Sequence, residues 1–182
     1  DWQVGGFYKI RGSFHIDDRY GPKIDIQQIR PVNEEDRKEG FIESDYNLQS
    51  RFDVEAIYKE IVAIAEKEIA DEPLKKLTLT ILEQHKDVLP KLPASPRQFF
   101  PFPGGWLEHT LSVTKNCLWL VDRYAGYYAE LTPPLNRNLV IAGAILHEIG
   151  RVAEWQTPEV PGITPEQSVP GRLFGHSILA RD

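Results

Sequence analysis

Residues 139–151, LVIAGAILHEIGR, constrain the fold and the chemistry of this chain more than any other stretch. They begin as an apolar helix and then place His147 and Glu148 side by side just before Gly150. Neighbouring side chains on a helix point about 100° apart, so this pair serves one centre only if that centre is a cation approached from two directions. The alternative is a polar helix end with a glycine cap. These residues alone leave both interpretations open.

Two further histidines lie in apolar contexts typical of helices. His109 is in the segment GGWLEHT, and His176 ends the run LFGH. A lone histidine on an apolar face is usually a core residue with satisfied hydrogen bonds, because an unpaired polar group is costly to bury. Together with His147 and Glu148, however, these rings offer the nitrogen and carboxylate ligands that transition metals bind.

With these residues in place, the sequence resembles a known family, the HD-domain metal-dependent phosphohydrolases. The similarity is greatest to the YhaM-type 3′→5′ exoribonucleases, which join an OB-fold to an HD domain. It lies in GGWLEHTLSV at 104–113, in NLVIAGAILHEIGRVAEW at 138–155 and in GRLFGH ending at His176, and it covers most of the chain from about Ile42. The resemblance implies an α+β fold, with a mainly α-helical HD domain preceded by a β-hairpin remnant of an OB-fold.

The resemblance also implies a metal centre. We predict that four side chains converge on it: His109, His147, Glu148 and His176. Nitrogen and carboxylate donors suit Mn²⁺, Fe²⁺, Co²⁺, Ni²⁺ or Zn²⁺, bound as one or two ions. A ligating imidazole usually has a hydrogen-bond acceptor on its other nitrogen, and Glu108 and Glu154 are alternative candidates for that role.

The expected reaction is hydrolysis of a phosphodiester. A bound metal ion lowers the pKa of water and holds a phosphate oxygen, so that hydroxide attacks phosphorus. The predicted catalytic residues are His147, Glu148 and Arg151. The expected substrate is single-stranded RNA or DNA, from which nucleoside monophosphates leave at the 3′ end.

The chain departs from the family signature at two positions. The signature is a His-Asp pair followed by Ile-Gly-Lys, whereas this chain has Glu148 and Arg151. Glutamate is one methylene longer, so its oxygens must be re-aimed to ligate a metal, and arginine replaces a compact ammonium by a planar fork. Two alternatives therefore stay open: an HD-type nucleotide phosphohydrolase, and a non-catalytic module that binds nucleic acid or nucleotides with a degenerate site.

Residues 1–32 have the pattern of a β-hairpin. Apolar and polar side chains alternate in FYKIR at 7–11 and in KIDIQQI at 23–29, on either side of a turn. In the resembling family this segment is the end of an OB-fold, a barrel that commonly binds single-stranded nucleic acid. The predicted nucleic-acid-binding residues are Tyr8, Lys9, Arg11, Phe14 and Tyr20. The alternative for each aromatic ring is a place in the interior of the barrel.

A charged linker is expected at 33–51, where the run EEDRKE offers no apolar face. The HD domain then occupies 52–182, with helices expected from about Asp53, Leu74, Gly105 and Asn136. The linker and the proline-rich segment 90–103 are expected to be the most mobile parts. Because the family continues before residue 1 and past residue 182, we expect this sequence to be a piece of a longer chain.

Composition bears on the binding partners and the cellular compartment of the protein. The net charge of −6 argues against nucleic-acid binding by overall electrostatics, although a local basic groove remains compatible with it. The single cysteine excludes a disulfide within the chain and fits a reducing compartment. With no segment apolar enough to span a membrane, we expect a cytoplasmic protein without a membrane partner. The sequence does not indicate an oligomeric state.

Overall fold

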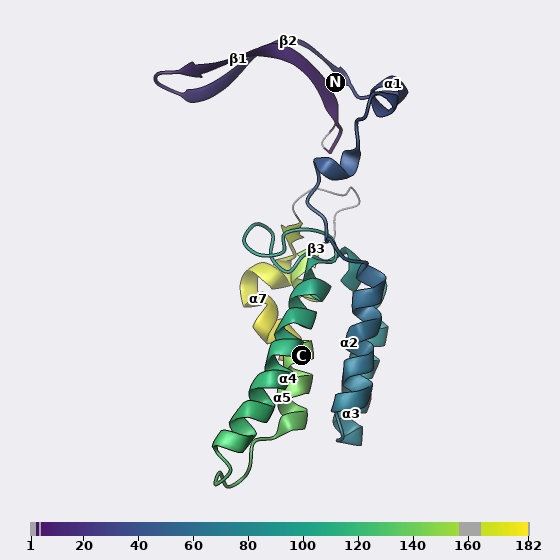
Figure 1. Cartoon of the computed structure of the whole chain (residues 1–182), viewed down its shortest axis with the longest axis vertical. Helices are drawn as coiled ribbons and strands as arrows, with labels where there is room; N and C mark the ends of the chain where they lie inside the picture. Colours follow the sequence, from purple (N-terminus) through teal and green to yellow (C-terminus); the bar gives the residue numbers. More distant parts are fainter. Residues whose placement is uncertain (1–2, 4, 157–164, 182) are drawn as a thin grey trace. The chain divides into compact units, whose positions relative to one another are not determined.

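The computed structural model describes residues 3, 5–156 and 165–181 of the chain (Figure 1). They belong to two compact parts, which we call unit 1, residues 1–47, and unit 2, residues 48–182. The division falls inside the segment 33–51 that was predicted to be a linker.

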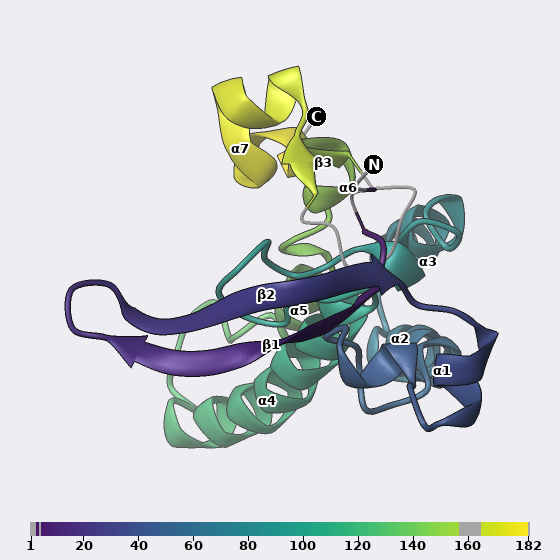
Figure 2. The same cartoon turned by 90° about the horizontal axis from the view of Figure 1, so that it is seen from above.

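Unit 1 is built on a long antiparallel hairpin, seen lengthwise in Figure 2. Its strands are β1, Tyr8–Asp17, and β2, Gly21–Pro31. The register of the ladder shifts at Gly12, where a β-carbon would lie 2.5 Å from the carbonyl oxygen of Asp25. The bulge therefore requires a glycine. The hairpin predicted from the alternating pattern is present.

The apolar side chains of the hairpin share one face, because successive residues of a strand point to opposite faces. Phe14 pairs with Ile24, and Ile10 pairs with Ile29. Phe14 is 66% exposed and Ile24 is 58% exposed. In the described part of unit 1 the sheet has two strands, so no further strand covers this face.

The charged segment after the hairpin is more ordered than predicted. It forms α1, Glu34–Lys38, and a short 3₁₀ helix η1, Glu43–Asp45. Asn33 caps α1 by accepting the backbone N–H groups of Glu35 and Asp36, and the Asp36 carboxylate accepts the N–H of Asn33 in return. This reciprocal capping box stabilises a helix that the charge pattern alone did not indicate.

The regular elements among the described residues of unit 2 are helices and one very short ladder. They are α2 Val54–Glu68, α3 Glu72–Gln84, η2 Leu89–Lys91, α4 Gly105–Tyr127, α5 Arg137–Leu146, α6 Arg151–Glu154, β3 Trp155–Gln156, β4 Glu166–Gln167 and α7 Val169–Arg181. No strand occurs between residues 74 and 146, all of which are described, as predicted. None of the described helices is long and apolar enough to cross a membrane.

The helices of unit 2 begin where the sequence places good caps. The Asp53 carboxylate accepts the N–H groups of Glu55 and Ala56 at the start of α2, and the Asn136 side chain accepts the N–H of Leu139 at the start of α5. Such caps satisfy backbone donors that have no partner within the helix. These two predicted helix starts are confirmed.

The core of unit 2 lies between α2, α3, α4 and α5, which pack in neighbouring pairs (Figure 1). On α4 Val113 and Cys117 are half-buried, and Leu120 is 39% exposed. The buried positions of α4 are Gly105, Trp106, Leu107, Thr110, Leu111, Thr114 and Val121. The face of α4 that packs on the core therefore includes glycine and threonine residues as well as apolar ones.

The proline-rich segment 90–103 is partly buried. Leu92 and Ala94 are fully buried, and the Leu92 carbonyl accepts the backbone N–H of Trp106 at 3.0 Å. Gly105 approaches the segment so closely that a β-carbon there would lie 2.1 Å from the Phe100 carbonyl oxygen. These contacts anchor the segment to the start of α4, which carries His109.

Candidate metal centre and nucleic-acid interface

His109 and His147 lie next to each other in unit 2. His109 is on α4 and His147 directly follows α5, and these two helices lie side by side (Figure 1). The centroids of the two imidazole rings are 5.5 Å apart. Binding of one ion by both rings requires such proximity, because metal–nitrogen bonds are about 2.1 Å long.

The surroundings of His109 favour the neutral imidazole, which is the form that binds metals. Burial lowers the pKa of the His109 imidazole, and the neighbouring His147 lowers it further. The Nδ1 atom of His147 is 2.8 Å from the carbonyl oxygen of Ala144. A carbonyl only accepts hydrogen bonds, so Nδ1 carries the proton and Nε2 keeps its lone pair for a ligand.

Two phenylalanines of the proline-rich segment cover His109. The ring centroids of Phe99 and Phe100 are 5.0 and 5.8 Å from that of His109. Sequence reasoning assigned these rings no role, since the contact depends on how the anchored segment folds back over α4. The only sign of this contact in the sequence is that Phe99 and Phe100 are adjacent.

Glu148 is close to the two histidines, but its carboxylate is held by Arg151. Helix α5 ends at Leu146, before the predicted end, and residues 147–150 form a turn in which the N–H of Arg151 donates to the carbonyl of Glu148. The guanidinium places Nε 2.5 Å from Glu148 Oε2 and Nη2 3.3 Å from Oε1. The Trp106 indole N–H donates to the Glu148 carbonyl oxygen at 3.0 Å, which fixes the turn to α4.

The Glu148 carboxylate is ionised in this setting. It is 8% exposed, and burial by itself raises the pKa of the carboxyl group. The hydrogen bonds and charge of Arg151 outweigh this effect, and the pKa ends below its usual value. Because Glu148 is already paired with a cation, it binds a metal only by sharing or releasing Arg151.

His176 reaches the same cluster from α7, directly after a break in that helix at Gly175, where φ is +69°. Its Nε2 atom is 3.4 Å from Glu148 Oε1. Two glycines allow α6 and α7 to approach each other closely. A β-carbon on Gly150 would lie 1.9 Å from the carbonyl oxygen of His176. A β-carbon on Gly171 would lie 2.4 Å from the carbonyl oxygen of Glu154. The sequence pattern did not assign this role to either glycine.

The predicted ligands fit a metal ion only in part. His109 and His147 present two neighbouring imidazoles, while Glu148 is engaged by Arg151. Across residues 3, 5–156 and 165–181, no group of three or more His, Cys, Asp or Glu side chains is arranged to hold a metal ion. The four-residue centre therefore stays a prediction, supported by the proximity of its members.

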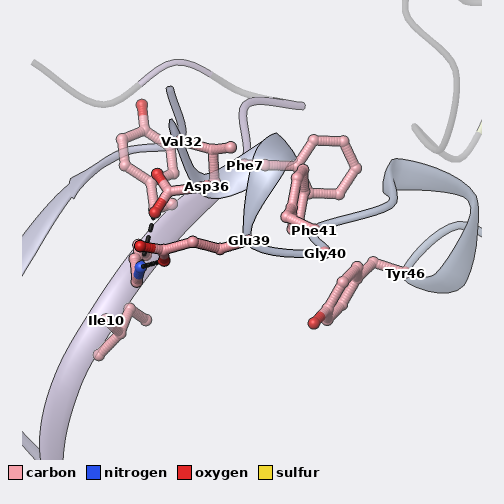
Figure 3. Close-up of a pocket in the computed structure, with 10 residues that line it drawn as sticks. Phe7, Ile10, Val32, Asp36, Glu39, Gly40, Phe41 and Tyr46 are labelled. Carbon is pink, nitrogen blue, oxygen red and sulfur yellow. Dashed lines mark hydrogen bonds and ion pairs between the residues drawn. The ribbon is translucent and has the colours of Figure 1, made fainter. Parts of the chain in front are cut away.

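Unit 1 contains a separate pocket of about 450 Å³ beside the hairpin (Figure 3). One wall is aromatic: the rings of Phe41 and Tyr46 stack with centroids 5.3 Å apart, and Phe7 meets Phe41 edge-on at 5.4 Å. The other wall is charged, with the Lys9 ammonium 2.6 Å from Asp36 and 2.9 Å from Glu39. Lys9 is thus paired with carboxylates rather than available to a phosphate.

The five predicted nucleic-acid-binding residues do not share one surface. Alternation along β1 puts Tyr8 and Phe14 on the apolar face and Lys9 and Arg11 on the opposite face. Tyr20 lies at the turn of the hairpin and stacks against Lys23, whose ammonium is 5.1 Å from the ring centroid. A single strand bound to one face would contact only part of the predicted set, whose role in binding stays a prediction.

Comparison with known proteins identifies homologues. The 3′-5′ exoribonuclease YhaM of Listeria monocytogenes (strain ATCC BAA-679 / EGD-e) is 29% identical over 137 residues, covering 69% of this chain and 40% of that protein. YhaM of Geobacillus sp. (strain WCH70) is 27% identical over 170 residues, covering 92% and 47%. A dihydroneopterin 2′,3′-cyclic phosphate phosphodiesterase of Methanocaldococcus jannaschii is 34% identical over 99 residues, covering 49% and 38%.

The chain is similar over most of its length to proteins named 3′-5′ exoribonuclease YhaM. This confirms the resemblance first recognised in the three histidine-containing motifs. No protein-family profile and no solved structure matches the chain. The chain spans less than half the length of the curated relatives named above. The similarity to YhaM proteins extends over most of this chain, so it is not confined to the segments around the histidines.

Proposed function

We propose that the protein is a metal-dependent phosphodiester hydrolase, and specifically an exoribonuclease that releases nucleotides from the 3′ end of single-stranded RNA. The observation that carries the proposal is the pairing of His109 and His147, with ring centroids 5.5 Å apart, in a relative of proteins named 3′-5′ exoribonuclease. Two imidazoles beside a buried carboxylate supply the donor types of a transition-metal site.

His109 and His147 would hold the metal ion, with Glu148 and His176 as further ligands. The metal would supply an activated water and positive charge for the phosphate. Arg151 is 11% exposed and bonded to the carboxylates of Glu148 and Glu154, so its charge first balances these two acids. Its use by a phosphate requires the guanidinium to leave at least one of them.

Unit 1 would contribute the nucleic-acid contacts. Two of its features support this role: the exposed aromatic rings of Phe14 and Tyr20, and the exposed basic side chain of Arg11 on the other face of β1. Aromatic rings stack on bases without regard to sequence, and basic side chains follow the phosphates. An exonuclease that acts on many RNA sequences needs this kind of contact.

A second candidate is a hydrolase acting on a small nucleotide. It is favoured by the relative named as a cyclic phosphate phosphodiesterase, which is 34% identical over 99 residues. A non-catalytic binding module is the third candidate, and the paired carboxylate of Glu148 favours it. The three candidates differ in their substrates. The exoribonuclease would hydrolyse single-stranded RNA, the second candidate a small nucleotide, and the binding module neither.

The test uses the full-length protein and a 5′-labelled single-stranded RNA. We expect stepwise shortening from the 3′ end with added Mn²⁺, and at least a 100-fold loss of rate in His147→Ala, because loss of a ligand removes both metal and hydroxide. The matched control is His85→Ala, since His85 lies at the end of α3 and belongs to no cluster described above. Full activity in His147→Ala would place the chemistry elsewhere.

A further inference from the structure

Phe100 has a backbone conformation that residues other than glycine rarely adopt. Its φ is +44°, in the left-handed region, where a bulky side chain is strained. Such residues persist only where their surroundings fix them, and they cluster at functional sites. Here the Phe100 carbonyl oxygen is held from two sides, because it accepts the backbone N–H of Ala94 at 3.2 Å and that of Phe102 at 2.9 Å. The strain therefore calls for a reason beyond connecting α3 to α4.

The conformation of Phe100 brings two aromatic rings to one side of the chain. In an extended backbone, consecutive side chains point to opposite sides. The rings of Phe99 and Phe100 instead both lie against the His109 imidazole, with centroids 5.0 and 5.8 Å from it. The centroid of His109 is in turn 5.5 Å from that of His147. The two phenylalanines thus border the histidine pair, His109 and His147, of the candidate metal centre.

The two phenylalanine rings differ in exposure. Phe100 is half-buried, and its ring meets that of Phe102 edge-on with centroids 6.0 Å apart. Phe99 is 36% exposed. The turn before Phe99 is fixed, because the hydroxyl oxygen of the buried Ser95 accepts the backbone N–H of Gln98 at 3.1 Å. Phe99 is therefore an aromatic surface that is held in position beside the site and is still open to solvent.

An exposed aromatic ring can bind any nucleobase, because every base has a π-face on which a ring can stack. We propose that Phe99, supported by Phe100, stacks on the base of the 3′-terminal nucleotide of the RNA while the phosphodiester of that nucleotide lies at the histidine pair. This proposal rests on the proposed function. It adds a base contact in unit 2 to the five residues of unit 1 predicted to bind nucleic acid. Stacking of the last base would hold the scissile bond at the site whatever the RNA sequence.

The test compares two 5′-labelled single-stranded RNAs as substrates of the full-length protein. They are identical except that the 3′-terminal nucleotide of one lacks its base. In the parent we expect kcat/KM for release of the terminal nucleotide to be about 5- to 100-fold higher when the base is present, as for one stacked base. Phe99→Leu should bring this ratio close to one, and Phe99→Trp, which keeps an aromatic ring, should restore it.

The matched control is Tyr127→Leu, which removes an exposed aromatic ring from the other end of α4. The distance from His109 to Tyr127 along the helix axis is about 27 Å. Tyr127→Leu should keep the ratio of the parent. A parent that treats both RNAs alike would overturn the proposal, and this comparison needs no variant to fold. A ratio that Phe99→Leu leaves unchanged would overturn it too. If Phe99→Leu slows both RNAs equally, the ring only shields His109 and the proposal fails.

Binding of two small compounds separates this proposal from the proposed function if the parent hydrolyses no RNA. The compounds are adenosine 5′-monophosphate and ribose 5-phosphate, titrated without added metal. We expect the parent to bind the nucleotide at least about 5-fold more tightly than the sugar phosphate, and Phe99→Leu to bind both equally. That result would retain the stacking surface while the exonuclease function fails. Equal binding of the two compounds by such a parent, or binding of neither, would defeat both proposals.

Discussion

Ile61 of the helical unit is fully buried, whereas Ile24 of the hairpin is 58% exposed, although both lie in segments with one apolar face. The helix that carries Ile61 finds other helices of unit 2 to cover its stripe. The hairpin has a two-stranded sheet and no second layer among the described residues of unit 1. An apolar face thus predicts an element, but burial depends on what else is present to pack on it.

The two units also use charge differently. In unit 1 the ion pairs of Asp36 with Arg30 and Lys9 join α1 to the hairpin. In unit 2 the most buried ion pairs, of Arg151 with Glu148 and Glu154, lie at the candidate metal centre. Charges therefore support the architecture of unit 1, whereas in unit 2 the core supports the architecture and the buried charges gather at the site.

The largest difference in stability is expected from truncating one isoleucine in each unit. Ile61→Ala should destabilise unit 2 by about 2–5 kcal/mol, because it leaves a cavity in a close-packed core. Ile24→Ala should change stability by less than about 0.5 kcal/mol in the 182-residue chain, because its side chain is mostly in water. Urea denaturation followed by circular dichroism measures both. Similar losses for the two variants would show that the hairpin face is covered in solution.

A smaller effect is expected where the helical unit carries the site. Gly150→Ala should destabilise unit 2 by about 1–3 kcal/mol and displace His176, because the added carbon meets the His176 carbonyl. Gly143 is the matched control, since a β-carbon there meets nothing within 4 Å and the residue is inside α5. Gly143→Ala should stabilise by up to about 1 kcal/mol. Denaturation curves and RNA hydrolysis together test the pair.

The same comparison explains which parts of the fold could be predicted. The starts of α2 and α5 followed from Asp53 and Asn136, because capping acts within a few residues of sequence. The close approach of His109 to His147 was expected from the family resemblance. Their physical separation is set by how α4 packs on α5, which no local pattern specifies.

Other features lay beyond prediction because they depend on contacts distant in sequence. The short helix α1 forms through a capping box in which Asp36 also binds Lys9 of β1. The pairing of Glu148 with Arg151 follows from the turn at 147–150, whereas the helix from Asn136 was expected to continue to His147 and Glu148. Which glycine permits close packing was also not predictable: Gly143 inside α5 faces open space, whereas Gly150 packs against the backbone of α7.

The smallest change in stability is expected at acid pH, where protonation of Asp36 should weaken unit 1. Hydrogen bonds from Arg30 and Lys9 hold the pKa of the Asp36 carboxyl well below its ordinary value of 3.8. The pKa of Asp36 is lower in the folded chain than in the unfolded chain. Asp36 therefore stabilises unit 1 fully when the pH is above its unfolded pKa, and this stabilisation is lost as the pH falls through its folded pKa. The effect is modest because Lys9 and Arg30 are about half exposed and water screens their charge.

Backbone NMR signals of β1 and α1, followed from pH 7 down to about pH 2, measure this contribution. We expect them to shift and broaden below the unfolded pKa of an aspartate, near 3.9, while the signals of α2 around the buried Ile61 change less. Asp36→Asn should give a less ordered hairpin at neutral pH and remove most of the acid dependence. An acid response in Asp36→Asn equal to that of the parent would assign it to other carboxylates, and the contrast between a charge-supported unit 1 and a core-supported unit 2 would then fail.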